Sequence, residues 1–422
     1  MDILTWAALS VDEQKAALQR SPLIGDSGLE QRVRAIIDAV ASRGDAALKE
    51  FNQKFDGFNS ANIDSLRLSE SEISAASARV SPELKAAIAQ AMANIDVFHS
   101  AQQFRPIDIE TQAGVRCELR SEPIEKVGLY IPGGSAPLIS TVLMLALPAK
   151  IAGCEKRVLV SPPPINDAIV YAANACGITE IYQVGGAQAI AALAFGTETI
   201  PSVDKIFGPG NRYVTEAKQQ VSQDAKGAQI DMPAGPSEVL VLADSSANAA
   251  FVAADLLSQA EHGPDSQVIL VSDSAAFIAA VQAEVASQLA QLPRKDIAAA
   301  ALSHSRYILT ADLAQAVTVT NAYAPEHLIV QTACDDELVE QFSSAASIFV
   351  GKWTPESAGD YASGTNHVLP TYGYSRTVSS LSLSDFFRRY TVQRLSATGM
   401  RNIGPAIVTL AEAESLEAHA NA

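Results

Sequence analysis

Residues 127–160 read VGLYIPGGSAPLISTVLMLALPAKIAGCEKRVLV, and they carry the clearest structural signal in the chain. A short apolar run, VGLYI, stops at Pro132-Gly133-Gly134. An apolar segment long enough for a helix follows, and RVLV then begins the next short run. Short strands rich in β-branched residues that alternate with helices are typical of a parallel sheet buried on both faces. This stretch therefore predicts an α/β fold.

Residues 127–149 contain no charged residue and could be mistaken for a membrane span. The stretch is interrupted by Pro132, Gly133, Gly134, Pro137 and Pro148, which in lipid would leave backbone groups without hydrogen-bond partners. A strand, a turn and a buried helix fit better, so we expect no membrane association.

The strand–helix alternation continues toward the carboxyl end. It passes through EIYQV (180–184) and resumes at EVLVLAD (238–244), SQVILVSD (266–273) and SRYILTAD (305–312). The rhythm predicts two α/β blocks with a boundary near Pro236-Ser237-Glu238. In residues 29–55 and 81–104, apolar residues recur at spacings of three and four positions, which predicts helices. The tail from about Ser375 reads as a separate lobe or dimerisation arm that ends in one helix, AIVTLAEAESLEAHA (406–420).

Composition limits the partners. The chain has 422 residues, with 30 Lys and Arg against 47 Asp and Glu, and a formal charge of −17. An acidic chain without a long basic block is a poor match for nucleic acid or an anionic membrane. The four cysteines show no C-x-x-C spacing, and the amino terminus lacks a secretory pattern. These features favour a reducing cytoplasm.

A first candidate site is DLLSQAEHG, residues 255–263. Asp255, Gln259 and His262 lie at i, i+4 and i+7 on one stripe of a helix that Gly263 would end. An amide oxygen and an imidazole at a helix terminus suit a divalent cation. A histidine near a helix C-cap explains the same pattern.

A second candidate is Glu326-His327, within YAPEHL. Neighbouring side chains on a strand point to opposite faces, so this pair shares a pocket only in a turn or at a strand end. A carboxylate and an imidazole together could remove two protons in succession. A solvated glutamate beside a packed histidine is the alternative. Asp360, flanked by Gly359 and Gly364, suggests either a tight loop that presents a carboxylate or a solvated Asx-turn.

Other signals are weaker. The glycine turns at 132–135, 185–188 and 208–211 do not complete G-x-G-x-x-G. A cysteine nucleophile could oxidise an aldehyde, but Cys154 and Cys176 read as packing residues. A metal-dependent binding or hydrolytic protein without a nicotinamide cofactor, and a catalytically silent relative, also remain open.

Taken together, several segments resemble the histidinol dehydrogenase family, in the family's order and over nearly the whole chain. They are GLYIPGGSAPLISTVLMLALPAKIAGC, VGGAQAIAALAFGT, FGPGNRYV, DMPAGPSEVLVLAD, LLSQAEHGPDSQ, NAYAPEHL, ASIFVG and SAGDYASGTNHVLPT.

The resemblance implies two incomplete Rossmann-like parallel-sheet domains, a helical N-terminal segment and a C-terminal dimerisation arm. Residues 1–25 would form the helical segment. Residues 26–125 and 239–375 would form the first, discontinuous domain, and residues 126–238 the second, NAD-binding domain. Residues 376–422 would be an arm that contributes to the partner's active site.

The resemblance also implies a cytoplasmic homodimer that oxidises L-histidinol to L-histidine in two NAD-dependent steps, with one zinc per active site. The residues that match the family's functional positions are Glu326 and His327 as the acid–base pair; Gln259, His262, Asp360 and His419 as zinc ligands; Ser237, Gln259, His262, His327, Asp360, Glu414 and His419 as substrate contacts; and Tyr130, Gln188 and Asn211 as NAD contacts.

Three expectations follow from these positions. His327 would take the alcohol proton, Glu326 would activate water for attack on the aldehyde, and His327 would take a proton again. Zinc would orient the substrate while NAD carries the hydride. Glu414 and His419 lie ~140° apart on an ideal helix, so both reach one site only if that helix frays near Ala418 or is held between two surfaces.

Overall fold

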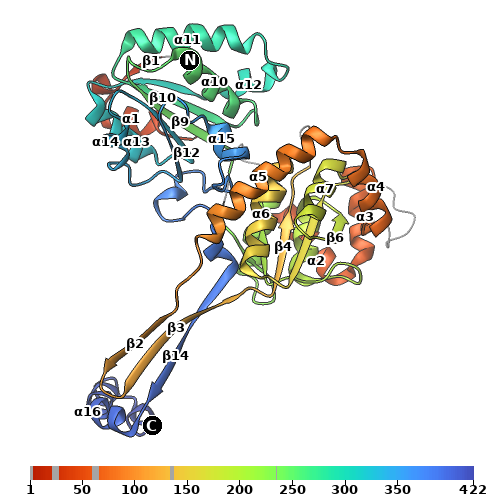
Figure 1. The fold of residues 1–422 in the computed structure, drawn as a ribbon, viewed down its shortest axis with the longest axis vertical. Coiled ribbons are helices and arrows are strands. Elements are labelled where there is room, and N and C mark those ends of the chain that lie inside the picture. Colours follow the sequence, from red (N-terminus) through yellow and green to blue (C-terminus); the bar gives the residue numbers. More distant parts are fainter. Residues whose placement is uncertain (1–2, 21–27, 59–65, 134–136, 234) are drawn as a thin grey trace.

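The protein consists of two α/β lobes and a long arm (Figure 1). The computed structural model describes residues 3–20, 28–58, 66–133, 137–233 and 235–422. Two of the sheets are fully parallel and form the lobes, and an antiparallel sheet of three strands forms the arm. The predicted α/β fold is confirmed. Within the described residues, no helix combines the length and apolarity needed to cross a bilayer.

The six-stranded lobe is built on the parallel sheet β1-β11-β10-β9-β12-β13. Its strands are β1 (Ile3–Thr5), β9 (Glu238–Ala243), β10 (Gln267–Ser272), β11 (Arg306–Leu309), β12 (His327–Gln331) and β13 (Ser347–Val350). Its helices are α1 (Val11–Ala17), α10 (Ala249–Ala260), α11 (Ala275–Leu289), α12 (Lys295–Ser303), α13 (Leu313–Tyr323), α14 (Asp335–Val339) and α15 (Glu356–Tyr361).

The five-stranded lobe is built on the parallel sheet β6-β5-β4-β7-β8. Its strands are β4 (Lys126–Tyr130), β5 (Lys156–Ser161), β6 (Glu180–Gln183), β7 (Lys205–Phe207) and β8 (Gln229–Ile230). Its helices are α2 (Leu29–Arg43), α3 (Asp45–Asp56), α4 (Glu70–Arg79), α5 (Pro82–Ser100), α6 (Ile139–Ala152), α7 (Asp167–Ala175), α8 (Gly186–Phe195) and α9 (Arg212–Gln223).

Both sheets follow the Rossmann order. Counted from β4 and from β9, the strands lie in the order third, second, first, fourth, fifth, which lacks only the sixth strand of the complete fold. In the six-stranded lobe, β1 adds an extra edge strand beside β11. The strand order therefore reverses between β4 and β7 in one sheet, and between β9 and β12 in the other.

The expected grouping of residues 26–125 with residues 239–375 differs from the packing. Helices α2 and α3 share a core with α8, through residues such as Val33, Leu48 and Ile190. Helix α5 shares another core with α6. The apolar faces of α2–α5 are thus buried against the five-stranded lobe. Apolar residues repeated every three and four positions predict that a helix is buried, but they do not specify which sheet it packs against. Residues 3–5, expected to be helical, pair with β11 as a strand.

The arm joins two distant parts of the sequence. Strands β2 (Ile107–Gln112) and β3 (Val115–Pro123) form a hairpin, and β14 (Phe387–Leu395) pairs antiparallel with β3. The arm projects away from both lobes and carries α16 (Ala397–Ala413) and α17 (Glu417–Ala420) at its tip (Figure 1). The arm therefore contains residues 107–123 in addition to the expected residues 376–422, although the resemblance implied that residues 107–123 belong to the first domain.

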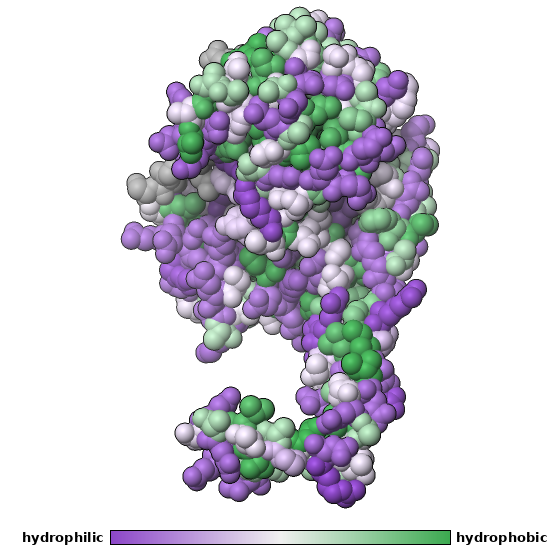
Figure 2. Space-filling view, turned by 90° about the vertical axis from the view of Figure 1, so that its left-hand side faces the viewer, coloured by the Kyte–Doolittle hydropathy of each residue, from purple (hydrophilic) through white to green (hydrophobic). Residues whose placement is uncertain are grey.

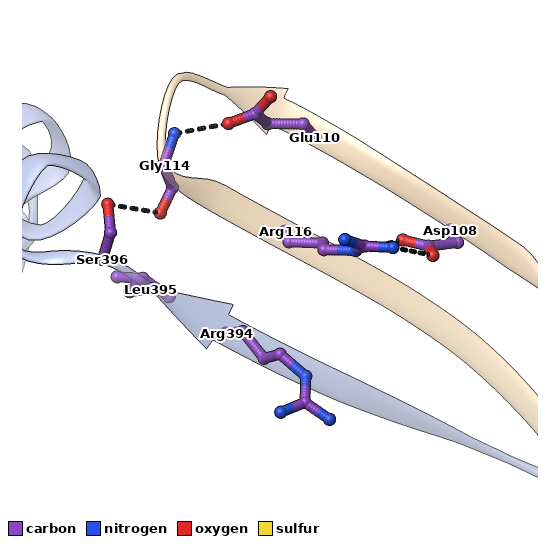
Figure 3. Close-up of a pocket in the computed structure, with 7 residues that line it drawn as sticks. All are labelled: Asp108, Glu110, Gly114, Arg116, Arg394, Leu395 and Ser396. Carbon is purple, nitrogen blue, oxygen red and sulfur yellow. Dashed lines mark hydrogen bonds and ion pairs between the residues drawn. The ribbon is translucent and has the colours of Figure 1, made fainter.

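A glycine turn fixes α16 to the hairpin. Gly114 has a φ of +83°, and a Cβ there would lie 2.7 Å from the backbone nitrogen of Gly399, so only glycine fits without strain. Ser396 Oγ donates to Gly114 O at 3.4 Å, beside a pocket of about 430 Å³ that also holds the Arg116–Asp108 ion pair (Figure 3). These contacts serve the arm's own architecture.

The terminal helix is interrupted, contrary to the single helix expected over 406–420. Helix α16 ends at Ala413, Ser415 has a φ of +59°, and the Leu416 N–H donates to Ala411 O at 2.8 Å. This is a Schellman-type ending. Glu414 and His419 consequently lie on either side of a helix break, which removes the angular conflict of one continuous helix.

Candidate active site

Glu326 and His327 lie where β12 begins. Helix α13 ends at Tyr323, Ala324 adopts a left-handed conformation with a φ of 56°, and Pro325 follows. The chain then enters β12 at His327, beside Glu238, the first residue of β9. The pair thus sits at the amino-terminal edge of the six-stranded sheet, at the kind of strand end that allows two neighbouring side chains to share a pocket.

One backbone segment holds both side chains. The Glu238 N–H donates to Glu326 Oε2 at 2.7 Å, and His327 Nδ1 donates to Glu238 O at 3.0 Å. Glu326 Oε2 and His327 Nδ1 are 3.6 Å apart. A carbonyl oxygen only accepts, so Nδ1 carries a proton and Nε2 is the atom left to react. Nε2 is buried without a hydrogen-bond partner.

Helix α15 adds two carboxylates. Glu356 Oε1 lies 3.7 Å from His327 Nδ1, and Asp360 Oδ1 lies 3.7 Å from Nε2. Donor atoms of His327, Glu356 and Asp360 all fall within 4.8 Å of one another. Asp360 is helical, not part of the loop or Asx-turn expected from its glycine neighbours. Oxygen and nitrogen donors gathered this closely suit a divalent cation.

Burial and charge perturb each ionisable group. Burial raises the pKa of Glu326 to about 8, although His327 opposes the shift. Burial alone would lower the pKa of His327, but the carboxylates of Glu356, Glu326 and Asp360 raise it well above its ordinary value. The pKa of Asp360 is lowered despite burial, because the imidazoles of His327, His367 and His262 surround it. Perturbed groups that cluster in this way are typical of catalytic sites.

Helix α10 brings Gln259 to the same cluster. Gln259 is fully buried, and its amide fits between two neighbours: the nitrogen donates to Glu356 Oε1, and the oxygen accepts from the Glu238 N–H at 2.9 Å. His262 is exposed two residues past the end of the helix, near Asp360. Asp255, on the same predicted stripe, instead accepts a hydrogen bond from Gln331 at 3.2 Å. It therefore belongs to the interior beside β12.

The structure brings together three of the four expected metal ligands, Gln259, His262 and Asp360. His419 lies on α17 and Glu414 follows α16, both exposed at the tip of the arm (Figure 1). Neither reaches the Glu326–His327 pair of its own chain. Ser237 lies one residue before Glu238 at the same sheet edge, where its carbonyl accepts from Gln267 N at 3.2 Å.

Sequence reasoning missed two residues. Glu356 is buried, four residues before Asp360 on one helix face; that i, i+4 spacing was the available signal. His367 donates from Nδ1 to Asp360 O at 2.9 Å, and its Nε2 accepts from Thr141 Oγ1 at 3.2 Å. Thr141 belongs to α6, so His367 joins the two lobes and the site lies at their seam.

The expected NAD contacts lie at the carboxyl edge of the five-stranded sheet. Tyr130 ends β4, and its hydroxyl accepts from the Gly186 N–H at 3.3 Å, at the start of α8. Gln188 is buried in the first turn of α8. Asn211 follows β7 and caps α9 by accepting from Tyr213 N at 3.0 Å. Because the strand order reverses between β4 and β7, this edge is where an open α/β sheet binds its ligand.

The four cysteines lie away from this cluster, which bears on the thiol alternative. Cys154 and Cys176 belong to a hydrophobic core, where burial raises their pKa values to about 11 and about 12. Cys117 lies on β3 in the arm. Cys334 follows the far end of β12, roughly 13 Å or more along the strand from His327. None of them is positioned as a nucleophile beside Glu326 and His327.

Comparison with known proteins gives a consistent result. A sequence model described as histidinol dehydrogenase matches residues 20–422. The histidinol dehydrogenase of Shewanella oneidensis strain MR-1 is 78% identical over 428 residues, which cover 100% of this chain and 98% of that protein. That of Salmonella typhimurium strain LT2 is 59% identical, with 100% and 96% covered. A crystal structure of histidinol dehydrogenase from Elizabethkingia anophelis matches with a TM-score of 0.94 at 48% identity, covering 100% of this chain and 96% of that one.

Proposed function

The chain belongs to the histidinol dehydrogenase family, oxidoreductases that oxidise histidinol in histidine biosynthesis, and from this premise we propose how its residues perform the reaction. The proposal is a four-electron oxidation of L-histidinol to L-histidine through the aldehyde, coupled to NAD and assisted by one zinc ion. The observation that carries it is that the backbone of Glu238 hydrogen-bonds to both Glu326 and His327, while Nε2 of His327 faces Asp360.

The residues present fit a nicotinamide cofactor. Tyr130, Gln188 and Asn211 gather at the carboxyl edge of the five-stranded sheet, beside its topological switch point. The start of α8 offers backbone N–H groups and the positive end of a helix dipole, which favour a phosphate. NAD, when bound, supplies the acceptor for the hydride in each oxidation. We assign these three residues to binding and orientation of the cofactor.

The residues also fit zinc. The buried Nε2 of His327 lacks a hydrogen-bond partner, and possible ligand atoms of His327, Glu356 and Asp360 lie within 4.8 Å of one another, so nitrogen and oxygen atoms of the kind that zinc binds gather in one place. We propose Gln259, His262 and Asp360 as ligands from one chain and His419 of a second chain as the fourth. Zinc, when bound, supplies an electrophilic point that orients the substrate, since the metal has no redox chemistry.

The protein's own groups move the protons. His327 accepts the alcohol proton at Nε2 in the first oxidation, because Nδ1 is already committed to Glu238 O. Glu326 draws a proton from the water that attacks the aldehyde. His327 releases its first proton to solvent between the two oxidations, and its Nε2 then accepts a proton from the resulting hydrate. Burial of both side chains keeps bulk water away from the reacting atoms during each hydride transfer. Ser237, together with Glu414 from the arm, contacts the substrate in this proposal.

The arm supports a homodimer with shared sites. Glu414 and His419 lie too far out on the arm to serve their own chain. The arm also exposes apolar side chains, which Figure 2 shows as green patches below the lobes; they include Ile107, Ile109, Met400, Ile407, Val408, Leu410 and Leu416. A second copy would bury these side chains while receiving the two polar residues. We place the assembly in the cytoplasm, consistent with four unpaired cysteines.

Metal removal tests this proposal. We expect one zinc per chain by atomic absorption, loss of at least about 100-fold in kcat after chelation and dialysis, and recovery on return of one zinc equivalent. An Asp360→Asn variant should bind zinc at least about 10-fold more weakly, because it loses a charged ligand. The exposed Asp312→Asn serves as a control that keeps wild-type affinity. Full activity in metal-free protein would contradict the metal assignment.

A further inference from the structure

Arg20 forms a buried ion pair with Glu238. Its Nε and Nη2 atoms donate to the two Glu238 oxygens at 3.1 and 3.0 Å, and only 12% and 1% of the two side chains are exposed. A bidentate pair of this kind fixes the orientation of both partners as well as their separation. Arg20 takes no part in the proton transfers described above, so the buried Arg20–Glu238 ion pair must have a different role.

Glu238 matters through its backbone. Its N–H holds the Glu326 carboxylate, and its C=O holds the His327 imidazole. A rotation of this one residue would displace both catalytic side chains together. Glu238 opens β9 and is paired with Gln267 of β10 on one side. On the other side the ladder to β12 begins only with Val239, opposite His327. On the side that faces the catalytic pair, the side chain of Glu238 therefore adds to the support of its own peptide groups.

Arg20 also reaches the segment that carries the catalytic pair. Nη2 donates to Ala324 O at 3.0 Å, and the guanidinium carbon lies 3.8 Å from the centre of the Tyr323 ring. Ala324, two residues before Glu326, holds its left-handed conformation without being glycine. Such a strained backbone conformation persists only where several neighbouring contacts stabilise it, and it is common at functional sites.

A second strained residue meets the same ion pair. Tyr372 has a φ of 55°, and its N–H donates to Glu238 Oε1 at 2.5 Å. Arg20 thus bridges the entry of β9 and the entry of β12, while Tyr372 holds the Glu238 carboxylate from the other side.

We propose that Arg20 is a positioning residue that sets the geometry of Glu326 and His327 through the side chain of Glu238 and the carbonyl of Ala324. The inference rests on the proposed roles of Glu326 and His327. Arg20 itself contacts none of the proposed metal ligands or substrate contacts, so we expect it to affect turnover more than binding.

Arg20→Lys provides the first test, since lysine keeps the charge but loses the planar fork. We expect kcat for L-histidinol to fall by roughly 10- to 100-fold, with KM within about three-fold of wild type and zinc content unchanged. Arg79→Lys is the matched control, because Arg79 forms a bidentate pair with Asp167 between α4 and α7. That variant should keep the wild-type kcat. A wild-type kcat for Arg20→Lys, or a loss confined to KM, would overturn the proposal.

Rescue separates positioning from general stability. In Arg20→Ala, added guanidinium ions should raise kcat at least about five-fold by occupying the vacated space between Glu238 and Ala324, while tetramethylammonium should not. Equal responses to the two cations, or no response from folded protein, would contradict the proposal. Should Arg20 variants not accumulate as folded protein, Glu238→Gln replaces them: it keeps the side-chain shape, and an unchanged kcat would overturn the proposal.

The wild-type enzyme distinguishes failure of the inference from failure of the proposed function. If wild-type protein oxidises histidinol with NAD while Arg20→Lys and Glu238→Gln match it, the positioning role is wrong and the function stands. If wild-type protein gives no NADH, the proposed function fails before any variant is compared.

Discussion

His327→Asn is expected to lose about 10³-fold or more of kcat in both oxidation steps, because the proposed mechanism uses one imidazole as the proton acceptor twice. Asparagine keeps a polar group that can still donate to Glu238 O, so the strand entry remains supported. Stopped-flow measurement of NADH formation, from L-histidinol and separately from L-histidinal, follows each step. The exposed His304→Asn is the matched control and should behave as wild type.

Glu326→Gln is expected to differ between the two substrates. Glutamine preserves shape but cannot accept the proton of water, so turnover of histidinal should fall by about 10²-fold or more, whereas the first hydride transfer falls less. Histidinal should then accumulate from histidinol. Turnover of histidinal at the wild-type rate would contradict the division of labour between Glu326 and His327.

Mixing two inactive variants is expected to restore activity if each site combines the lobes of one chain with the arm of another. His327→Asn damages the lobes and His419→Asn damages the arm. After random subunit exchange, each mixed dimer contains one intact site, so the mixture should recover about a quarter of wild-type activity. Steady-state rates before and after exchange, with differently tagged chains, measure this recovery.

The control is a mixture of His327→Asn and Glu326→Gln. Both changes lie in the lobes, so neither site of a mixed dimer is intact and no recovery is expected. If His327→Asn and His419→Asn exchange subunits and still remain inactive, or if a dilute monomer is fully active, the shared-site arrangement is wrong.

Local pattern predicted the sheet strands well. VGLYI, RVLV and EIYQV became β4, β5 and β6, and EVLVLAD became β9, because short buried runs between turn residues have few alternatives. The strand order is a long-range property that local pattern does not give, and the family resemblance implied only Rossmann-like sheets. The resemblance was less reliable for the packing of α2–α5, since a stripe of apolar residues states that a helix is buried without stating against what.

The structure places Gln259, His262, Glu326, His327 and Asp360 near one another, and their roles stay predictions. Asp255, on the same predicted helix stripe, instead hydrogen-bonds to Gln331. Glu356 and His367 were missed because their roles depend on burial and on contacts between lobes. Glu238 was not predicted for a further reason. Its backbone atoms, not its side chain, contact Glu326 and His327, and backbone contacts leave no pattern in the sequence.

The most direct test is the amount of NADH formed from a limiting quantity of L-histidinol. Purified wild-type protein with excess NAD should give two NADH per histidinol, together with L-histidine as the product. One NADH per histidinol, with the aldehyde as the end product, would contradict the four-electron account and remove the role assigned to Glu326.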